Sequence, residues 1–469
     1  MELLLTLPPH GSRQTAVEQA LRAAIVDGRL APGAVLPSTR ALAADLGLAR
    51  GTVVAAVEQL AVEGLVETRQ GAPTRVAHVP PALRRTLRPT SARPVEARRA
   101  LADFGGGDPD LTLFPRAWWA SAVRRGLSEA AADALGYGDP QGSPVLRSAL
   151  VDHLSRTRGV IADPDQVVTT AGFTHALVVL ARALRATGAR RIAVEDPSLA
   201  QHRDLLAATG LDVAPVVVDA DGVEVDELPE RSGTVALVTP AHHTPLGVTL
   251  SAPRRSELAG WAARVGGIIV EDDYDGELRY DRRPLPALQA LDPNRVIYAG
   301  TASKSLVPGL RLGWCVLPPD LVGPTITAMV SLGGQPVSIV EQLALADLLR
   351  SGRYDRHVRT LLTAYRRRRD LLVATLAERV PAVRVEGVAA GLKALIRLPR
   401  GVDEATVVAA LEERDIALMS LRSFCASART AAGGPALVVN FSRPFGHEYR
   451  AAVAHLADAL AAILAPDSP

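Results

Sequence analysis

The sequence predicts an α/β protein preceded by a small helical domain, and three observations support this. The 469 residues exceed one ordinary domain, so we expect two or three. From about residue 101 onward, apolar strand-like runs alternate with Ala- and Leu-rich helical patterns, which is typical of a mostly parallel sheet. Residues 81–100 carry six arginines, three prolines and one glutamate, a composition that predicts a basic linker. We therefore expect domains at 1–80 and 101–469.

The composition limits the classes of protein to consider. Apolar residues make up 48% of the chain, enough for sizeable cores, and the net charge of +2 does not indicate nucleic-acid binding by bulk charge. Cys315 and Cys425 form no disulfide framework, which favours a reducing compartment. The N-terminus lacks the pattern of a signal peptide, and no apolar run reaches the roughly 18 residues of a membrane span. We therefore expect a cytoplasmic protein.

The first 80 residues predict three short helices and a hairpin. The first helix is indicated by apolar residues at helical spacing before Gly28, namely Val17, Leu21, Ala24 and Ile25. Ser38 is placed to cap a second helix in "STRALAADLG". The third helix ends at Gly64 and has the apolar face Val53, Val57, Leu60 and Ala61. Two short strands around residues 70–73 follow, which completes the order of a winged helix-turn-helix.

This order places suitable residues for DNA contact. Arg50 and Thr52 lead the third helix, where side chains reach base edges in a major groove, and Arg40 lies on the preceding helix. Gly71 allows the backbone of the wing to approach a groove. A small helical bundle with solvated arginines remains an alternative. Residues 1–80 carry seven arginines and seven acids, so only the arrangement favours DNA.

The stretch "GRLAPGAVLPSTRALAADLGLARGTVVAAVEQLAVEGLVETRQGAPTRV" resembles the winged-helix domain of the GntR family of bacterial repressors, over most of residues 12–77. The resemblance implies that Arg40, Arg50, Thr52 and Gly71 contact operator double-stranded DNA. Family members often carry a further basic residue where this chain has Val54. The base preference of relatives is therefore not transferable.

The larger zone contains an unusual lysine. The sequence has only two lysines, Lys304 and Lys393, so 52 − 2 leaves 50 arginines. Lys304 follows an apolar run in "GTASKSLVPGLRLGW". Arginine cannot replace lysine where an amine must bond covalently to the aldehyde of pyridoxal phosphate (PLP). In a chain that uses arginine for positive charge, this position favours covalent chemistry over a surface role.

Other strand ends carry groups that a PLP site requires. Such a site needs a carboxylate at the ring nitrogen, a tyrosine at the ring oxygen, and a helix start, hydroxyls and a guanidinium for the phosphate. The chain has these candidates in that order: Asp272, Tyr274, the main chain of Phe173 and Thr174, Thr301, Ser303 and Arg311. The acidic run at 271–277 is also compatible with a solvated turn or an incidental cation site. It lacks the positions of a calcium loop, and we predict no metal site.

Four segments together resemble fold-type-I aminotransferases: "DFGGGDPDLTLFPRAWWASAVRRGL", "LGYGDPQGSPVLRSALVDHLSRTRGV", "VEDDYDGELRY" and "GTASKSLVPGLRLGW". Nearly the whole chain is similar to MocR/GabR regulators, in which a GntR head precedes an aminotransferase-like domain with a large, mostly parallel sheet and a smaller C-terminal α+β part. The resemblance implies that Lys304 forms the PLP aldimine. It assigns Asp272 to the pyridine nitrogen, Tyr274 to the ring oxygen, and Thr301 and Arg311 to the phosphate.

The same resemblance implies a domain-swapped homodimer. Each DNA-binding head then lies near the partner's large domain, and Tyr137, in "LGYGDPQG", reaches the phosphate from the second subunit.

The chain departs from the enzymes at three positions. Leu199 stands where an aromatic usually stacks on the pyridine ring, and Thr244 replaces an asparagine. Val438 stands where enzymes have an arginine that holds the substrate carboxylate. Arg422 and Arg443 are near in sequence, but the sequence does not place them. We therefore expect PLP to bind, without efficient amino-acid transamination; a residual half-reaction is compatible with this.

The favoured hypothesis is a PLP-dependent transcription regulator that senses a small amine, or PLP itself, through the aldimine at Lys304. One alternative is an active PLP aminotransferase that carries a DNA-binding module. Another is a DNA-binding protein whose large domain is a dimerisation scaffold without cofactor. The six arginines of the linker either add phosphate contacts or form a bare connection.

Overall fold

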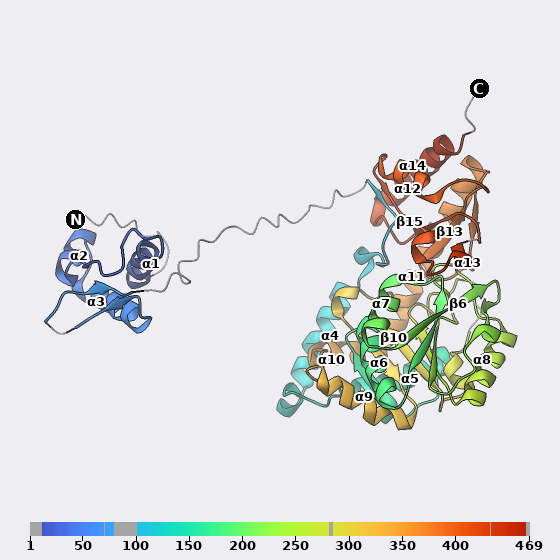
Figure 1. Ribbon diagram of the computed structural model, residues 1–469, viewed down its shortest axis with the longest axis horizontal. Coiled ribbons are helices and arrows are strands. Elements are labelled where there is room, and N and C mark those ends of the chain that lie inside the picture. The colour runs from blue at the N-terminus through green and yellow to red at the C-terminus, as the bar shows by residue number, and fades with distance from the viewer. Residues whose placement is uncertain (1–11, 70, 79–100, 281–284, 432, 466–469) are drawn as a thin grey trace. The chain divides into compact units, whose positions relative to one another are not determined.

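A computed structural model describes residues 12–69, 71–78, 101–280, 285–431 and 433–465. The chain divides into two compact units, Met1–Arg98 and Arg99–Pro469 (Figure 1). The predicted basic linker at 81–100 lies outside the described residues.

The first unit has the predicted winged helix-turn-helix elements. Its helices are α1 (Arg13–Val26), α2 (Thr39–Leu46) and α3 (Arg50–Val62), and strands β1 (Val66–Glu67) and β2 (Arg75–Val76) pair antiparallel. The Ser38 hydroxyl accepts a hydrogen bond from the Ala41 amide at 3.2 Å and caps α2, as predicted. The predicted apolar faces of α1 and α3 pack into one small core, where the predicted residues are buried except Ala61, which is partly buried.

The second unit is built on an eight-stranded sheet in the order β4-β11-β10-β9-β8-β5-β6-β7. Its strands are β4 (Val167–Thr170), β5 (Arg191–Asp196), β6 (Asp212–Asp219), β7 (Gly222–Val223), β8 (Thr234–Val238), β9 (Ile268–Asp273), β10 (Val296–Thr301) and β11 (Gly313–Val316). Strands β5, β6, β8, β9 and β10 are parallel, whereas β11 and β7 run antiparallel to their neighbours. The mostly parallel sheet is therefore confirmed.

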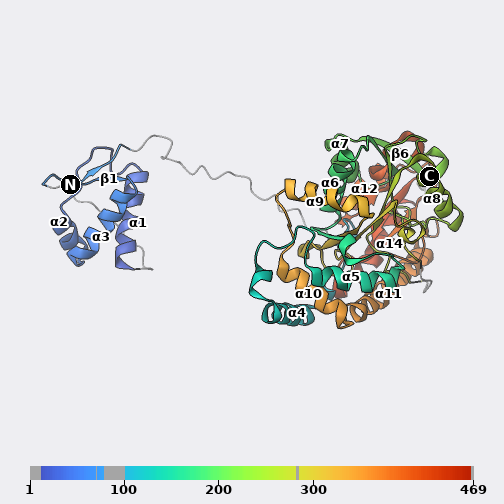
Figure 2. The same cartoon turned by 90° about the horizontal axis from the view of Figure 1, so that it is seen from below.

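Helices cover both faces of this sheet, because adjacent strand residues point to opposite sides. Ile297 packs with α6 (Phe173–Ala186), α7 (Ala200–Ala208) and α9 (Pro319–Ser331). Tyr298 packs toward the opposite face, with α5 (Pro144–Arg158), α10 (Ile339–Arg350) and α11 (Arg353–Arg379). Figure 2 shows α6 and α9 on one side and α5 and α11 on the other. Helix α8 (Ala252–Val265) covers the second face further along, and α4 (Arg116–Glu129) packs on α10.

The smaller C-terminal part contains a second sheet in the order β12-β13-β16-β15. The strands are β12 (Arg384–Glu386), β13 (Lys393–Arg397), β15 (Met419–Ser420) and β16 (Ala436–Asn440), with α12 (Glu404–Glu412), α13 (Ala428–Ala431) and α14 (Tyr449–Ile463). A separate pair joins β14 (Ile416–Ala417) to β3 (Ala102–Asp103), which brings the start of this unit to its C-terminal part.

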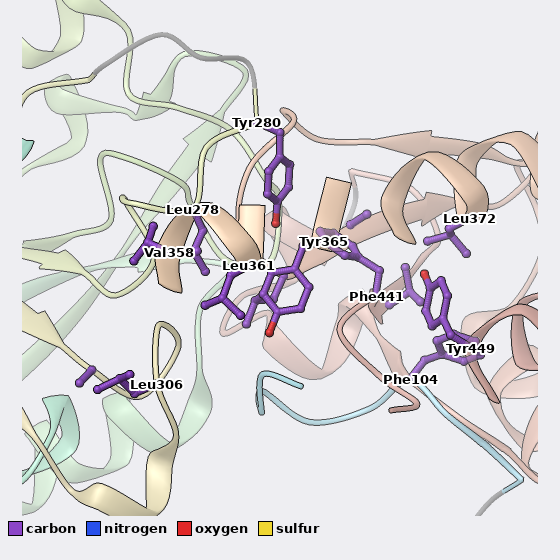
Figure 3. Packing of buried hydrophobic residues seen from close by; sticks show 14 of the residues in the cluster. Phe104, Leu278, Tyr280, Leu306, Val358, Leu361, Tyr365, Leu372, Phe441 and Tyr449 are labelled. Atoms are coloured by element: carbon purple, nitrogen blue, oxygen red, sulfur yellow. The ribbon is translucent and has the colours of Figure 1, made fainter. Parts of the chain in front are cut away.

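One apolar cluster connects the two parts of the second unit. Phe441 and Tyr449 of the smaller part belong to the same buried cluster as Leu306 and Leu361 (Figure 3). Helix α11 supplies residues along this cluster, so the small sheet is held on the large one by continuous packing. None of the helices in the described part of the chain has the length and hydropathy that a membrane span requires.

Candidate functional site

The carboxyl ends of β9 and β10 meet at one cavity. Because these neighbouring strands are parallel, with Asp272 opposite Ala299, their C-terminal residues lie at the same sheet edge. The cavity has a volume of about 420 Å³. It brings together all the predicted cofactor residues except Tyr137: Phe173, Thr174, Asp272, Tyr274, Thr301, Ser303, Lys304 and Arg311.

Lys304 points its amine into this cavity. Its Nζ donates a hydrogen bond to the Gly107 carbonyl at 2.8 Å. Burial lowers the pKa of Lys304 below its usual range, although Asp108, Asp275 and Asp272 act in the opposite direction. A lowered pKa increases the fraction of neutral amine, which is the form that attacks a carbonyl group.

Asp272 provides a buried carboxylate oxygen that lacks a partner. Within the described part of the chain, its Oδ1 has no hydrogen bond. Burial and the nearby Asp273 raise the pKa of Asp272 well above its usual range. Such a group requires a donor or a positive charge from a ligand, because an unsatisfied buried oxygen is unfavourable. A protonated pyridine nitrogen is a donor of the required kind.

An anion cradle lies at the start of α6. Gly172 has φ +83° and no side chain caps the helix, so the first amides of α6 face outward at Phe173 and Thr174. The guanidinium of Arg311 is adjacent, since its Nη1 lies 3.8 Å from where a Cβ on Gly172 would stand. Thr301 Oγ1 accepts a hydrogen bond from the Ser303 amide at 3.2 Å, which holds that turn beside the cradle. Amides, hydroxyls and a guanidinium suit a phosphate group.

A polar chain orients Tyr274. Its hydroxyl donates to the His242 carbonyl at 3.1 Å, and His242 Nδ1 lies 2.9 Å from Asp275 Oδ2. The residues present therefore fit PLP at four points: amine, ring nitrogen, ring oxygen and phosphate. Local sequence pattern does not predict that His242 and Asp275 support Tyr274, because their contact is tertiary.

Three further cavity residues were missed by the sequence analysis. Glu195 of β5 accepts hydrogen bonds from the amide and hydroxyl of Thr239, at 2.9 and 2.6 Å, and burial raises its pKa to about 7. His202 of α7 lines the cavity, and burial together with the two lysines lowers its pKa to about 4. Lys393 enters from the small sheet. Its rarity in the sequence was the one signal that pointed to it.

Two of the departures from the enzymes meet in space. Val438 is 2% exposed and belongs to an apolar cluster made by Leu395, Leu421, Phe424, Ala436 and Val438, against which Leu199, Leu246 and Met419 pack. Arg443 does not replace the missing arginine, because it pairs with Asp103 and with Asp108 at 3.0 Å. Arg422 is exposed and does not line the cavity.

Tyr137 lies away from the Lys304 cavity within one chain. Its side chain is fully exposed and lines a separate hollow together with Arg125 and Gln335. Its predicted contact with the phosphate depends on a second subunit and stays a prediction.

The predicted DNA-contacting residues lie on the first unit as expected for a winged helix-turn-helix. Arg40 and Arg50 are exposed in the first turns of α2 and α3, and Thr52 is half-buried in the first turn of α3. Gly71 has φ +78° in the connection between β1 and β2, a backbone conformation that favours glycine. Arg40 and Arg50 thus both lie at the N-terminal ends of their helices.

Comparison with known families agrees with both units. Residues 13–76 match the family of bacterial regulatory proteins, gntR family, and residues 100–435 match aminotransferase class I and II, a PLP-binding family. The second match alone covers more than half of the chain.

Several curated relatives match most of this chain and are named as regulators. An uncharacterized HTH-type transcriptional regulator of Bacillus subtilis, YhdI, is 36% identical over 82% of this chain and 83% of its own length. The HTH-type pyridoxine biosynthesis regulator PdxR of Corynebacterium glutamicum is 33% identical over 90% and 91%. The probable rhizopine catabolism regulatory protein MocR of Rhizobium meliloti is 33% identical over 82% of each. The chain belongs to the MocR-type helix-turn-helix transcription regulators.

Solved structures place the second unit of this MocR-type regulator among the aminotransferases. The multiple substrate aminotransferase of Thermococcus profundus is 26% identical, with a TM-score of 0.68 over 78% of this chain and 92% of that one. The fold-type-I architecture is therefore confirmed, and the GntR head indicates DNA binding.

Proposed function

We propose that this regulator binds PLP covalently at Lys304 and changes its hold on operator DNA when a small amine, or PLP itself, occupies the cavity. The observation that carries the proposal is the buried amine of Lys304 in the same cavity as the unpartnered Oδ1 of Asp272. When bound, PLP supplies an aldehyde that condenses with a primary amine.

The roles of the chain's own residues follow from their positions. Lys304 holds the cofactor, and Asp272 accepts a hydrogen bond from the ring nitrogen. Tyr274 binds the ring oxygen, while Arg311 and Thr301, with Ser303 and the main chain of Phe173 and Thr174, bind the phosphate. Val438 and its apolar neighbours occupy the position where the enzymes carry the arginine for the α-carboxylate, which favours sensing over turnover.

DNA binding is assigned to residues 1–80, with Arg40, Arg50, Thr52 and Gly71 as contacts, and effector binding to residues 101–469, with 81–100 as linker. We place these parts in a domain-swapped homodimer with Tyr137 completing the partner's site. An effector shifts the equilibrium between two states of the large domain only if it binds them with different affinities. PLP as effector is supported by the likeness to PdxR, whose name refers to pyridoxine biosynthesis.

An active aminotransferase that carries a DNA-binding module remains the second candidate. It is supported by the fit of Lys304, Asp272 and Tyr274 to the cofactor and by the 26% identity to an aminotransferase.

Lys304 allows a direct test with the full-length protein. We expect borohydride to trap a pyridoxyl group on Lys304, found by mass spectrometry of peptides, and neither Lys304→Ala nor Lys304→Arg to be labelled. Lys304→Arg is the matched control because it keeps the positive charge and loses the covalent chemistry.

DNA binding is measured in the same three proteins on the chain's own promoter fragment. Wild type should change its affinity when PLP or an amine is added, and both variants should not respond. Unlabelled Lys304 in the wild type would contradict the proposal. Steady turnover of an amino acid with a keto acid, without an effect on DNA, would favour the enzyme.

A further inference from the structure

Lys393 lies beside the position where the enzymes carry their carboxylate-binding arginine. In the small sheet, Lys393 of β13 pairs with Asn440 of β16, and Leu395 pairs with Val438. Directly paired residues point to the same face of a sheet, and so do residues two apart on one strand. Lys393 therefore shares a face with Val438 and lines the cavity, as does Met419, which is paired with Val438.

The ammonium group of Lys393 has no anionic partner. Among the described residues, no hydrogen bond or ion pair reaches its Nζ, which lies 5.6 Å from the centroid of the Phe424 ring. Asp275 attracts it electrostatically, but that carboxylate is bound to His242 at 2.9 Å. Burial and the neighbouring Lys304 lower the pKa of Lys393 to about 8. The charged form is therefore less favoured than in a solvated lysine, and an anion beside Nζ would stabilise it.

The other cations among the described residues of the cavity already have a contact or a proposed role. Lys304 donates to the Gly107 carbonyl, and Arg311 lies at the start of α6. Lys393 is the remaining cation among the described residues that line this cavity. It approaches from the small sheet, whereas Lys304 and Arg311 follow strand β10 of the large one.

We propose that Lys393 binds the anionic group of the effector, and that the effector is a small primary amine that also carries a carboxylate. This inference rests on the proposed function, because it needs Lys304 to hold PLP in the same cavity. The carboxylate is then bound by a residue of β13 and not by the residue at position 438, where the apolar cluster excludes a charge. Lysine suits this role because its ammonium is a compact single-point contact, whereas the planar guanidinium of arginine favours a two-point fork.

The test compares ligands that differ only in charge. Full-length protein loaded with PLP is titrated with amino carboxylates of two to six carbons and with the corresponding carboxamides, and binding is followed by the cofactor absorbance and by calorimetry. The variants are Lys393→Met, which keeps the length of the side chain without its charge, and Arg397→Met. The latter removes a charge from the same strand, where Arg397 pairs with Glu386 at 2.9 Å outside the cavity.

In wild type, we expect at least one carboxylate to bind about tenfold or more tightly than its carboxamide, since a charge-assisted hydrogen bond contributes roughly this much. Lys393→Met should lose this preference and keep its affinity for the carboxamide within twofold. Arg397→Met should keep the preference.

Two results would overturn the inference: a wild type that does not distinguish carboxylates from carboxamides, or a Lys393→Met variant that still does. A borohydride-trapped pyridoxyl group on Lys393 in place of Lys304 would also overturn it. If the wild type forms no covalent link with PLP at all, the proposed function fails, and this inference fails with it. If the link forms on Lys304 but the ligands are not distinguished, only the inference fails.

Discussion

The cavity of this regulator has two walls of opposite character. The large-sheet wall follows the ends of β9 and β10 and is polar, with Asp272, Thr301 and Lys304. The small-sheet wall is backed by the apolar cluster, in which Val438 is 2% exposed, and Lys393 is the charge that it presents. The comparison indicates that the groups suited to hold a cofactor gather at the ends of β9 and β10, although Leu199 and Thr244 also follow strands of the large sheet. On the small-sheet wall, apolar packing stands where the enzymes carry an arginine.

The two walls differ because different features of the backbone position their side chains. At the large sheet, groups from separate strands and from α6 must converge on one small molecule, so a change at one position weakens a joint arrangement. On the small sheet, the alternation of side chains along a strand determines only which face of the sheet Leu395 and Val438 point to. Such positions tolerate apolar side chains of suitable volume. An apolar residue that packs into the cluster can therefore stand there in place of an arginine.

The largest effect is expected from placing an arginine on the small-sheet wall. Val438→Arg buries a charge in the apolar cluster and should lower the free energy of unfolding by about 3–5 kcal/mol, measured by urea denaturation. Val438→Leu, the control, should change it by roughly 1 kcal/mol through tighter packing. If Val438→Arg keeps wild-type stability and binds α-amino acids more tightly, the two walls differ less than their packing indicates.

A smaller effect is expected from Asp272→Asn on the large-sheet wall. The amide cannot supply the negative charge opposite a protonated pyridine nitrogen, so the affinity for PLP should fall about tenfold or more, or roughly 1.5–3 kcal/mol. Equilibrium titration with PLP measures this, and borohydride should still label Lys304. Unchanged affinity would show that Asp272 does not face the ring nitrogen.

The smallest effect concerns pH and Glu195. Its pKa is raised from 4.5 to about 7 by burial, so the stabilising contribution of the protonated form is present below pH 4.5 and is lost as the pH rises through 7. Without PLP, Glu195→Gln should therefore gain stability over wild type between pH 5 and pH 8, on the order of 1–3 kcal/mol.

Thermal unfolding at both pH values checks this prediction. Glu386→Gln, which changes a partly exposed carboxylate of β12, is the control and should show no such gain. An equal stability difference at pH 5 and pH 8 for Glu195→Gln would show that burial does not raise the pKa of Glu195.

Much of the fold followed from local pattern. The strands ending near Asp272 and Thr301 were readable because each is a short apolar run bounded by polar residues. The helix cap at Ser38 was readable because a hydroxyl before a helix serves one local purpose. That most of the predicted cofactor residues line one cavity has a related reason, since parallel strands bring their carboxyl ends to one edge. Tyr137 differs, because its predicted contact involves a second subunit.

The sequence by itself determined the order of a winged helix-turn-helix and an α/β domain, and it identified Lys304 through its scarcity and its place after a strand. Only the tertiary structure decided that Leu199 and Val438 pack in one cluster and that Lys393 enters the cavity of Lys304. The reason is physical. Local spacing sets which way a side chain points from its own element, whereas the neighbours of that side chain depend on how separate elements pack.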